Sequence, residues 1–238
     1  MIFGTSCRYY GRQIGNYKII QCIGEGRYGV CFSVEANGER LILKRLKPHI
    51  FSRNKGKTDC EIQILSQLNH GGIPRFLEIV NEKGFYGFVL EQKHGDTVEA
   101  ILFKQKHRFT NKEIFNTGQQ LLEIIKYLHE KGIVHRDIRI PNVLIDGDKV
   151  SLIDFGLARW VDNKRYTRDI DFLYFGDFLL YLLYSSYKKG KQKSRPWYEE
   201  LSLTYVQRMF LKRLLKLEEP YKDIDEIARD FQTTFGCE

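Results

Sequence analysis

The stretch from Ile133 to Gly156 reads IVHRDIRIPNVLIDGDKVSLIDFG and decides the fold. It places Asp137 five residues before Asn142, and Asp154 follows twelve residues later inside an apolar run. One carboxylate can orient and deprotonate a hydroxyl, while the asparagine amide and the other carboxylate can hold magnesium. These residue types at this spacing suit transfer of a phosphoryl group from ATP, where positioning and charge neutralisation do most of the catalysis.

The composition is that of a globular chain with room for a sizeable core. Of 238 residues, 42% are hydrophobic and 29% are charged, which fits one large domain or two small lobes. The N-terminus does not resemble a signal peptide. The most apolar segment, 172–187, carries Asp177 and is short for a membrane span, so we expect a buried helix and no membrane span.

The cysteines and the net charge bear on location and partners. Five cysteines are scattered without a C-x-x-C pair, which disfavours a disulfide framework and a zinc site and predicts a cytoplasmic protein. The net charge of +8 favours acidic partners, nucleic acid included. The densest basic run, KKGKQKSR at 188–195, is more simply a solvated loop. Since no aromatic stacking platform is evident, nucleic-acid binding is the weaker interpretation.

The first part of the chain has the pattern of an antiparallel sheet. We expect strands over 17–23, 30–34, 40–45, 76–80 and 85–91, with Asn37-Gly38 as a two-residue hairpin turn. A helix is expected over 58–68, where Ile64, Leu65 and Leu68 share one face.

The pattern becomes helical after Gly95. Thr110-x-x-Glu113 is a capping box that begins a long helix, and Gly132 ends it. Two strands, 143–145 and 149–153, flank a turn at 146–148, and the chain from about 171 is helical. The junction of the two parts lies near 92–95, and a crevice between two such lobes is a natural ligand site.

Three features of the first part suit ATP. Residues 24–30 read GEGRYGV, and glycines at this spacing let the backbone approach phosphates. A dinucleotide-binding turn would need a helix directly afterwards, whereas a strand follows. Lys44 ends an apolar strand and can reach phosphates, with Glu61 as its partner. Two alternatives stay open: Lys44 as a surface lysine, and Thr58-x-x-Glu61 as a capping box that begins the helix.

Together with His135-Arg136-Asp137 and Asp154-Phe155-Gly156, these motifs follow one order with compatible spacings. Over roughly 17–185 the chain resembles the protein kinases of the Ser/Thr/Tyr superfamily. The resemblance implies an α+β, bilobal fold with a small antiparallel sheet in the N-lobe and a helical C-lobe. It implies a single kinase-like domain over 1–238, with the N-lobe at about 14–92 and the C-lobe at about 95–238.

The resemblance also implies site residues. Gly24, Gly26 and Gly29 would cover the phosphates of ATP, which Lys44 contacts while Glu61 holds it. Asp137 would take the hydroxyl proton, and Asn142 and Asp154 would bind Mg²⁺. Around adenine it implies Ile23, Val30 and Leu144 as the sandwich, Leu90 as gatekeeper, and Glu91 to Lys93 as the hinge. Leu65, Phe76, His135 and Phe155 would form a spine, and Asp171 would anchor the catalytic loop.

The chain departs from the family in four respects. Ile42 stands where alanine usually faces adenine, and Arg139 stands for the catalytic-loop lysine. Asp171 follows Asp154 by only seventeen residues, about half the usual gap, and no Ala-Pro-Glu lies between them. The arginine that normally pairs with that glutamate would fall near Asp223, so both halves of one ion pair are missing. A protein-docking platform is therefore expected to be absent.

The resemblance implies a Mg²⁺- and ATP-dependent serine/threonine protein kinase with a protein substrate, in which Asp137, Lys44, Arg139 and Asn142 are catalytic. One alternative is a kinase-fold enzyme acting on a small molecule, or a partner-dependent ATPase, because the platform is missing. Another is a non-catalytic scaffold, for which Ile42 is the best argument. Arg136 before Asp137 also suggests Tyr166 and Thr167 as phosphorylation sites.

Overall fold

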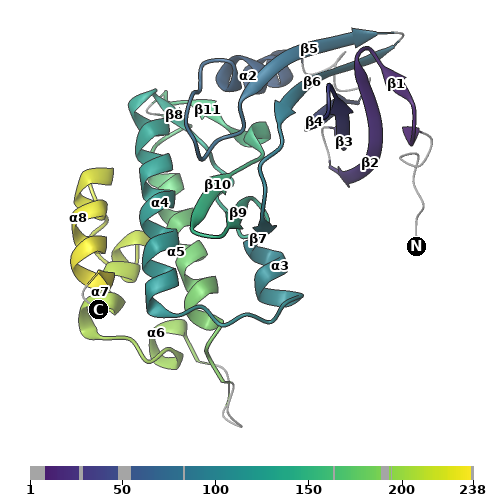
Figure 1. Cartoon of the computed structure of the whole chain (residues 1–238). Helices are drawn as coiled ribbons and strands as arrows, with labels where there is room; N and C mark the ends of the chain where they lie inside the picture. Colours follow the sequence, from purple (N-terminus) through teal and green to yellow (C-terminus); the bar gives the residue numbers. More distant parts are fainter. Residues whose placement is uncertain are drawn as a thin grey trace. The chain divides into compact units, whose positions relative to one another are not determined.

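The computed structural model describes residues 9–26, 29–47, 55–82, 84–162, 164–188, 193 and 195–236. The chain divides into two compact units, Met1–Lys93 and His94–Glu238 (Figure 1). The division falls within the stretch 92–95, where the sequence pattern changes from strands to helices. The basic run at 188–195 lies mostly outside the described residues, so its interpretation stays a prediction.

The first unit is built on one antiparallel sheet with strand order β1-β2-β3-β4-β6-β5. The strands are β1 (Gln13–Ile14), β2 (Tyr17–Glu25), β3 (Gly29–Ala36), β4 (Glu39–Leu46), β5 (Phe76–Glu82) and β6 (Phe85–Glu91). Asn37 and Gly38 have φ of 53° and 81° and join β3 to β4, which confirms the two-residue hairpin. A left-handed conformation at both positions is what this turn requires, and asparagine and glycine tolerate it best.

Alternation along the strands gives this sheet two different faces. One face carries a hydrophobic cluster to which Phe32, Val34, Leu41, Leu43 and Val89 belong. The opposite face carries the residues between them. There Ile42 pairs across strands with Ser33 and Leu90, and Lys44 pairs with Cys31 and Phe88. The face of Lys44 is therefore set by strand register.

Two hydrogen bonds join the edges of this sheet although β2 and β5 are not paired in it. The Tyr17 hydroxyl donates to Glu78 Oε1 at 2.5 Å, and the Gly15 amide donates to Glu82 Oε2 at 2.9 Å. They bring the start of the sheet to β5, so the sheet is curled. Tyr17 is buried, and burial, followed by its bond to Glu78, raises its pKa to about 12.

Helix α2 (Lys55–Leu65) follows the sheet's first strands. Because it extends back to Lys55, Thr58 and Glu61 both lie within the helix. The alternative in which Thr58 caps the helix and Glu61 lies in its first turn is wrong. Ile64 and Leu65 are buried, as their shared helical face predicts.

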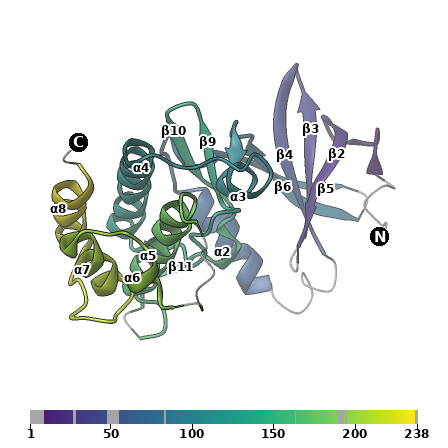
Figure 2. The same cartoon turned by 90° about the horizontal axis from the view of Figure 1, so that it is seen from below.

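The second unit is mainly helical, with short strands between the helices (Figure 2). Its helices are α3 (Val98–Phe103), α4 (Asn111–Glu130), α5 (Asp169–Tyr184), α6 (Trp197–Glu200), α7 (Tyr205–Leu214) and α8 (Ile224–Phe235), with the 3₁₀ turn η2 (Phe155–Leu157). Its strands are β7 (Asp96–Thr97), β8 (Ile133–Val134), β9 (Val143–Asp146), β10 (Lys149–Leu152) and β11 (Arg159–Trp160). Strand β9 pairs with β7 and β10, and β8 pairs with β11.

Helix α4 begins and ends as its sequence predicts. The Thr110 hydroxyl accepts from the Glu113 amide, and the Glu113 carboxylate accepts from the Thr110 amide at 2.7 Å, which is the expected capping box. Gly132 follows the helix with φ of 69°. Along its length α4 packs against α8, α5 and β10 (Figure 1). A Cβ on Gly118 would lie 2.4 Å from the Phe231 ring, so glycine permits close packing against α8.

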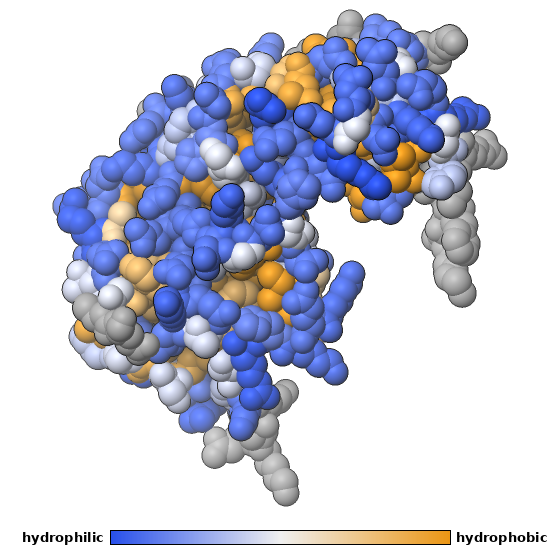
Figure 3. Space-filling view, in the orientation of Figure 1, coloured by the Kyte–Doolittle hydropathy of each residue, from blue (hydrophilic) through white to orange (hydrophobic). Residues whose placement is uncertain are grey.

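Helix α5 is the apolar segment singled out in the sequence. Phe172, Phe175, Phe178, Leu179 and Leu182 are buried, so it is an internal helix of this unit, as expected. Within the described parts of the chain, no helix is long and apolar enough to cross a membrane. Hydrophilic side chains cover most of the face shown in Figure 3 on each unit.

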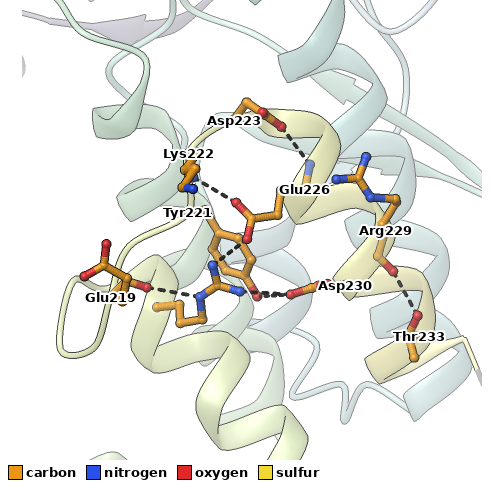
Figure 4. A network of polar contacts seen from close by, with 9 residues as sticks. Glu219, Tyr221, Lys222, Asp223, Glu226, Arg229, Asp230 and Thr233 are labelled. Carbon is orange, nitrogen blue, oxygen red and sulfur yellow. Dashed lines mark hydrogen bonds and ion pairs between the residues drawn. The ribbon is translucent and has the colours of Figure 1, made fainter.

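Figure 4 labels Tyr221, Glu226 and Asp230, which belong to a network that joins the last two helices around Arg213. Its guanidinium donates to Glu226 Oε1 at 2.6 Å and to Asp230 Oδ2 at 3.1 Å, and it stacks on Tyr221 at 3.8 Å. Asp223 accepts from the Glu226 amide at 2.8 Å and caps α8. Asp223, where the family's arginine would fall, is thus a helix cap here.

Candidate active site

Lys44 in the first unit is paired with Glu61, as the sequence predicted. Lys44 Nζ on β4 lies 2.7 Å from Glu61 Oε1 on α2, and both side chains are nearly buried. Because a buried ammonium needs an opposite charge, this pair is the stable arrangement for both groups. The alternative of a solvent-exposed surface lysine is wrong.

The prediction that Val30 contacts adenine is wrong. Its side chain belongs to the hydrophobic cluster with Phe32 and Val34, on the face opposite Lys44. Cys31 pairs directly with Lys44 and takes the position on that face. The pairing across the hairpin at Asn37-Gly38 places Cys31 opposite Lys44 and therefore on the same face of the sheet. Val30, the next residue back along the strand, points to the other face.

Ile42 and Leu90 are direct cross-strand partners on the face of Lys44. An adenine ring held by this face would meet both side chains, as the sequence suggested for the base. Ile23, from the end of β2, is 49% exposed. Its apolar side chain is therefore available for a ligand in this unit.

The three glycines differ in their surroundings. A Cβ on Gly24 or Gly26 would meet nothing within 4 Å, whereas a Cβ on Gly29 would lie 2.4 Å from the Arg45 carbonyl oxygen. Gly29 is thus required by the packing of β3 on β4. The open backbone at Gly24 and Gly26 fits the close approach of a phosphate.

The segment expected to form the hinge is held by its side chains. Lys93 Nζ donates to Glu91 Oε1 at 3.0 Å and to the Gly71 carbonyl at 2.8 Å, and the Arg75 amide donates to Glu91 Oε2 at 3.1 Å. These contacts fix the course of the backbone that would offer hydrogen bonds to adenine.

In the second unit, Asp137 is surrounded by donors. Arg139 binds its carboxylate with two hydrogen bonds, from Nε to Oδ1 at 2.5 Å and from Nη2 to Oδ2 at 3.0 Å. Asn142 Nδ2 donates to Asp137 Oδ2 at 2.8 Å and to its carbonyl at 2.9 Å. The fork from Arg139 was not predicted, because the sequence indicates only a basic group. These bonds to Asp137 raise the pKa of Arg139.

Asn142 uses its side-chain nitrogen within the site and has an oxygen that could hold a cation. Because its amide nitrogen is used by Asp137, its Oδ1 is the atom left to ligate a metal. Asp154 lies after β10 with φ of 61° and its carboxylate accepts from the Gly156 amide at 3.3 Å. The backbone joins the two residues, because the Ile153 amide donates to the Asn142 carbonyl at 2.9 Å.

This donor set fits magnesium. One carboxylate and one amide oxygen, completed by phosphate oxygens and water, is a set that Mg²⁺ accepts. Among the described residues no three His, Cys, Asp or Glu side chains gather as metal ligands.

Asp171 anchors the catalytic loop, as the sequence predicted. Its buried carboxylate accepts from the His135 amide at 2.9 Å, the Arg136 amide at 2.7 Å and His129 Nε2 at 3.0 Å. Arg136 has φ of 66°, an uncommon conformation for a side-chain-bearing residue. The hydrogen bonds that the Asp171 carboxylate accepts from this backbone compensate for that strain.

Two of the four predicted spine residues contact each other: His135 meets Phe155 edge-on at 4.7 Å in the second unit. In the first unit Phe76 lies beside Phe88, which was not predicted for the spine, with ring centroids 6.2 Å apart. Burial lowers the pKa of His135, so its ring is neutral and packs as a core residue. Leu144, expected to contact adenine, lies on β9 and is largely buried.

A family model described as the protein kinase domain matches residues 17–176, two thirds of the chain. The match runs from the first long strand through Lys44, Asp137 and Asp154 to α5. This chain belongs to the protein kinase family. Its enzyme class, protein kinase, and its α+β bilobal fold class follow from that membership. Use of ATP, generally with Mg²⁺, is implied by it.

Individual kinases resemble this chain to different extents. It is 38% identical over 226 residues to a probable serine/threonine-protein kinase, YbdM, of Bacillus subtilis, covering 90% of this chain and 87% of that protein. It is 30% identical to the serine/threonine-protein kinase dkf-2 of Caenorhabditis briggsae over 63% of this chain. It is 34% identical to the CTD kinase subunit alpha of Schizosaccharomyces pombe over 67% of this chain.

These relatives differ in how much of their own length this chain covers. The chain spans only 13% of the nematode protein and 28% of the yeast protein, in contrast to the bacterial one. Those two kinases carry much more than the part that this kinase resembles.

Proposed function

We propose that this kinase transfers the γ-phosphate of ATP to a serine or threonine hydroxyl of a protein, and that residues 1–238 act as one kinase domain. The observation that carries the proposal is the arrangement around Asp137. Its carboxylate is nearly buried, it is fixed by Asn142, and the remaining oxygen of Asn142 is left for a cation.

In the proposed reaction the acceptor oxygen attacks the γ-phosphorus while the bond to the β–γ bridging oxygen breaks, so ADP leaves. The hydroxyl proton passes to the carboxylate of Asp137. Both oxygens of Asp137 accept hydrogen bonds from Arg139, whose side chain is 56% exposed. Arg139 must therefore release at least one oxygen, and its guanidinium is then available to the transferred phosphoryl group.

The other residues position the nucleotide. Lys44, held by Glu61, would contact the phosphates, and Gly24, Gly26 and Gly29 would cover them. Asn142 and Asp154 would hold Mg²⁺, which neutralises phosphate charge when bound. Ile23, Ile42, Leu90 and Leu144 would contact the base, with Glu91 to Lys93 as hinge. Cys31 takes the place that was first assigned to Val30.

The choice of a protein hydroxyl rests on the bacterial relative, which is named a probable serine/threonine-protein kinase and is similar over most of both chains. A small-molecule acceptor is the second candidate. It is favoured by the short segment between Asp154 and Asp171, which lacks Ala-Pro-Glu. Nucleic-acid binding by the basic surface and a cytoplasmic location stay predictions, supported by the charge and by the scattered cysteines.

The acceptor can be found directly. Purified protein is incubated with γ-labelled Mg-ATP and, separately, with serine/threonine peptide pools, tyrosine peptide pools and a metabolite fraction. The Asp137→Asn variant is the control. Label on serine or threonine that disappears in the variant is expected. Label only on a small molecule, or equal labelling by the variant, contradicts the proposed function.

A further inference from the structure

The residue before Asp137 occupies an unusual position. Arg136 has a left-handed backbone, its amide is bound by Asp171, and the next residue carries the reactive carboxylate. Any change in how Arg136 is held is transmitted to Asp137 through one peptide bond. The partners of the Arg136 side chain therefore bear on catalysis.

That side chain reaches into the segment after Gly156. Arg136 Nη1 donates to the Leu157 carbonyl at 3.0 Å, and its guanidinium carbon lies 4.7 Å from the centroid of the Tyr166 ring. A second guanidinium, that of Arg165, lies 5.4 Å from the same centroid. An aromatic face attracts such cations, the more so when the pair is partly shielded from water.

The local backbone presents Tyr166 to Arg136. Asp162 Oδ1 accepts from the amides of Lys164, Arg165 and Tyr166 at 2.8–2.9 Å, and the Asp162 amide donates to the Tyr166 carbonyl at 3.2 Å. Immediately before this turn, the Val161 amide donates to the Gly132 carbonyl at 2.8 Å. The turn is thus closed on itself and joined to the end of α4.

We propose that Tyr166 is a positioning residue for the phosphoryl transfer: its unmodified ring fixes Arg136, and through it Asp137. This inference rests on the proposed function and adds to it how the phosphoryl-transfer activity is regulated. The turn already supplies Arg136 with a partner, so neither Tyr166 nor Thr167 needs a phosphate for activity. This proposal is an alternative to the prediction that Tyr166 and Thr167 are activating phosphorylation sites.

The kinetic test compares Tyr166→Phe, which keeps the aromatic face, with Tyr166→Leu, which keeps apolar bulk alone. Tyr205→Leu is the matched control, because Tyr205 is 73% exposed on α7. Each protein is treated with phosphatase, and mass spectrometry verifies that residues 166 and 167 are unmodified. For Tyr166→Leu we expect kcat to fall about tenfold with KM for ATP unchanged. Tyr166→Phe should retain kcat within about twofold.

Two results would overturn the proposal. One is equal loss in Tyr166→Phe and Tyr166→Leu, which would assign the role to the hydroxyl. The other is full activity of Tyr166→Leu, which would leave the ring without a role in positioning.

A second measurement needs no activity. Hydrogen exchange of the five bonded amides of this turn is followed in the Asp137→Asn background, which should not phosphorylate itself; they are those of Val161, Asp162, Lys164, Arg165 and Tyr166. The amides should be protected when Tyr166 is retained and when it is replaced in Y166F, and they should exchange faster in Y166L. Equal exchange in all three proteins contradicts the inference. If instead the wild type transfers no phosphate while Y166L alone loses protection, the proposed function fails and the assignment of Tyr166 as the partner of Arg136 stands.

Discussion

Among the glycines at the end of β2 and the start of β3, some are expected to be needed for binding ATP and another for the stability of the sheet. Gly24→Ala and Gly26→Ala add a methyl group to open space, so the free energy of unfolding should change by less than about 0.5 kcal/mol. If phosphates approach this backbone, KM for ATP should rise several-fold in both variants. Gly29→Ala instead forces β3 from β4 and should cost about 1–3 kcal/mol.

Chemical denaturation and initial-rate kinetics on the same preparations check this prediction. Unchanged KM for ATP in both Gly24→Ala and Gly26→Ala would remove these glycines from the nucleotide site. Stability losses of similar size in all three variants would contradict the distinction that the packing makes.

At this scale the sequence identified residue types better than their atomic contacts. Asp137, Asn142 and Asp154 were predicted from residue type and spacing, and Asp171 from the resemblance to the family's buried aspartate. The fork from Arg139 and the ring of Tyr166 against Arg136 depend on side-chain directions within irregular loops, which no periodic pattern reports. Val30 was misassigned because it was chosen from its place after Gly29, not from strand alternation.

Among the elements, α7 and α8 are joined by the Arg213 network (Figure 4). Arg213→Met should lower the free energy of unfolding by about 1–2 kcal/mol, because Glu226 and Asp230 lose a partly buried cation. Arg229→Met, on the exposed side of α8, is the matched control and should change it by less than about 0.5 kcal/mol. Urea denaturation of both variants measures the difference, and equal losses would exclude the network as the cause.

The contact between β2 and β5 predicts a dependence on alkaline pH. The pKa of Tyr17 is raised from 10.0 to about 12 in the folded protein. The folded state therefore binds this proton more tightly than the unfolded state. The resulting stability is present below pH 10 and is lost as pH rises from 10 to about 12. In Tyr17→Phe the fall in unfolding free energy over this interval should be smaller than in wild type. Parallel curves would contradict the assignment.

Long elements were predictable and very short ones were not. The hairpin at Asn37-Gly38 and the capping box of α4 carry turn and cap residues that act locally, so the sequence reports them. Strands such as β8 and β11 contain two residues each and depend on pairing with distant chain. The start of α2 was ambiguous because Gly56 and Thr58 favour a later start, whereas the helix includes both.

At the scale of the whole molecule, the residues proposed for phosphate transfer are present, while the Ala-Pro-Glu motif is absent between Asp154 and Asp171. Membership of the protein kinase family accounts for the former, and the short segment between Asp154 and Asp171 defines the latter. The segment is nevertheless held by its own contacts, through Asp162 and Tyr166. The chemistry is therefore better determined than the acceptor.

The central claim is that Asp137 acts on the acceptor hydroxyl and is not needed to bind the nucleotide. The most direct measurement combines calorimetric titration with Mg-ATP and a phosphoryl-transfer assay on wild type and Asp137→Asn. We predict that the variant binds Mg-ATP with a dissociation constant within about threefold of wild type. Its transfer rate should fall by about 10² to 10⁴. Transfer by Asp137→Asn at the wild-type rate would contradict the account.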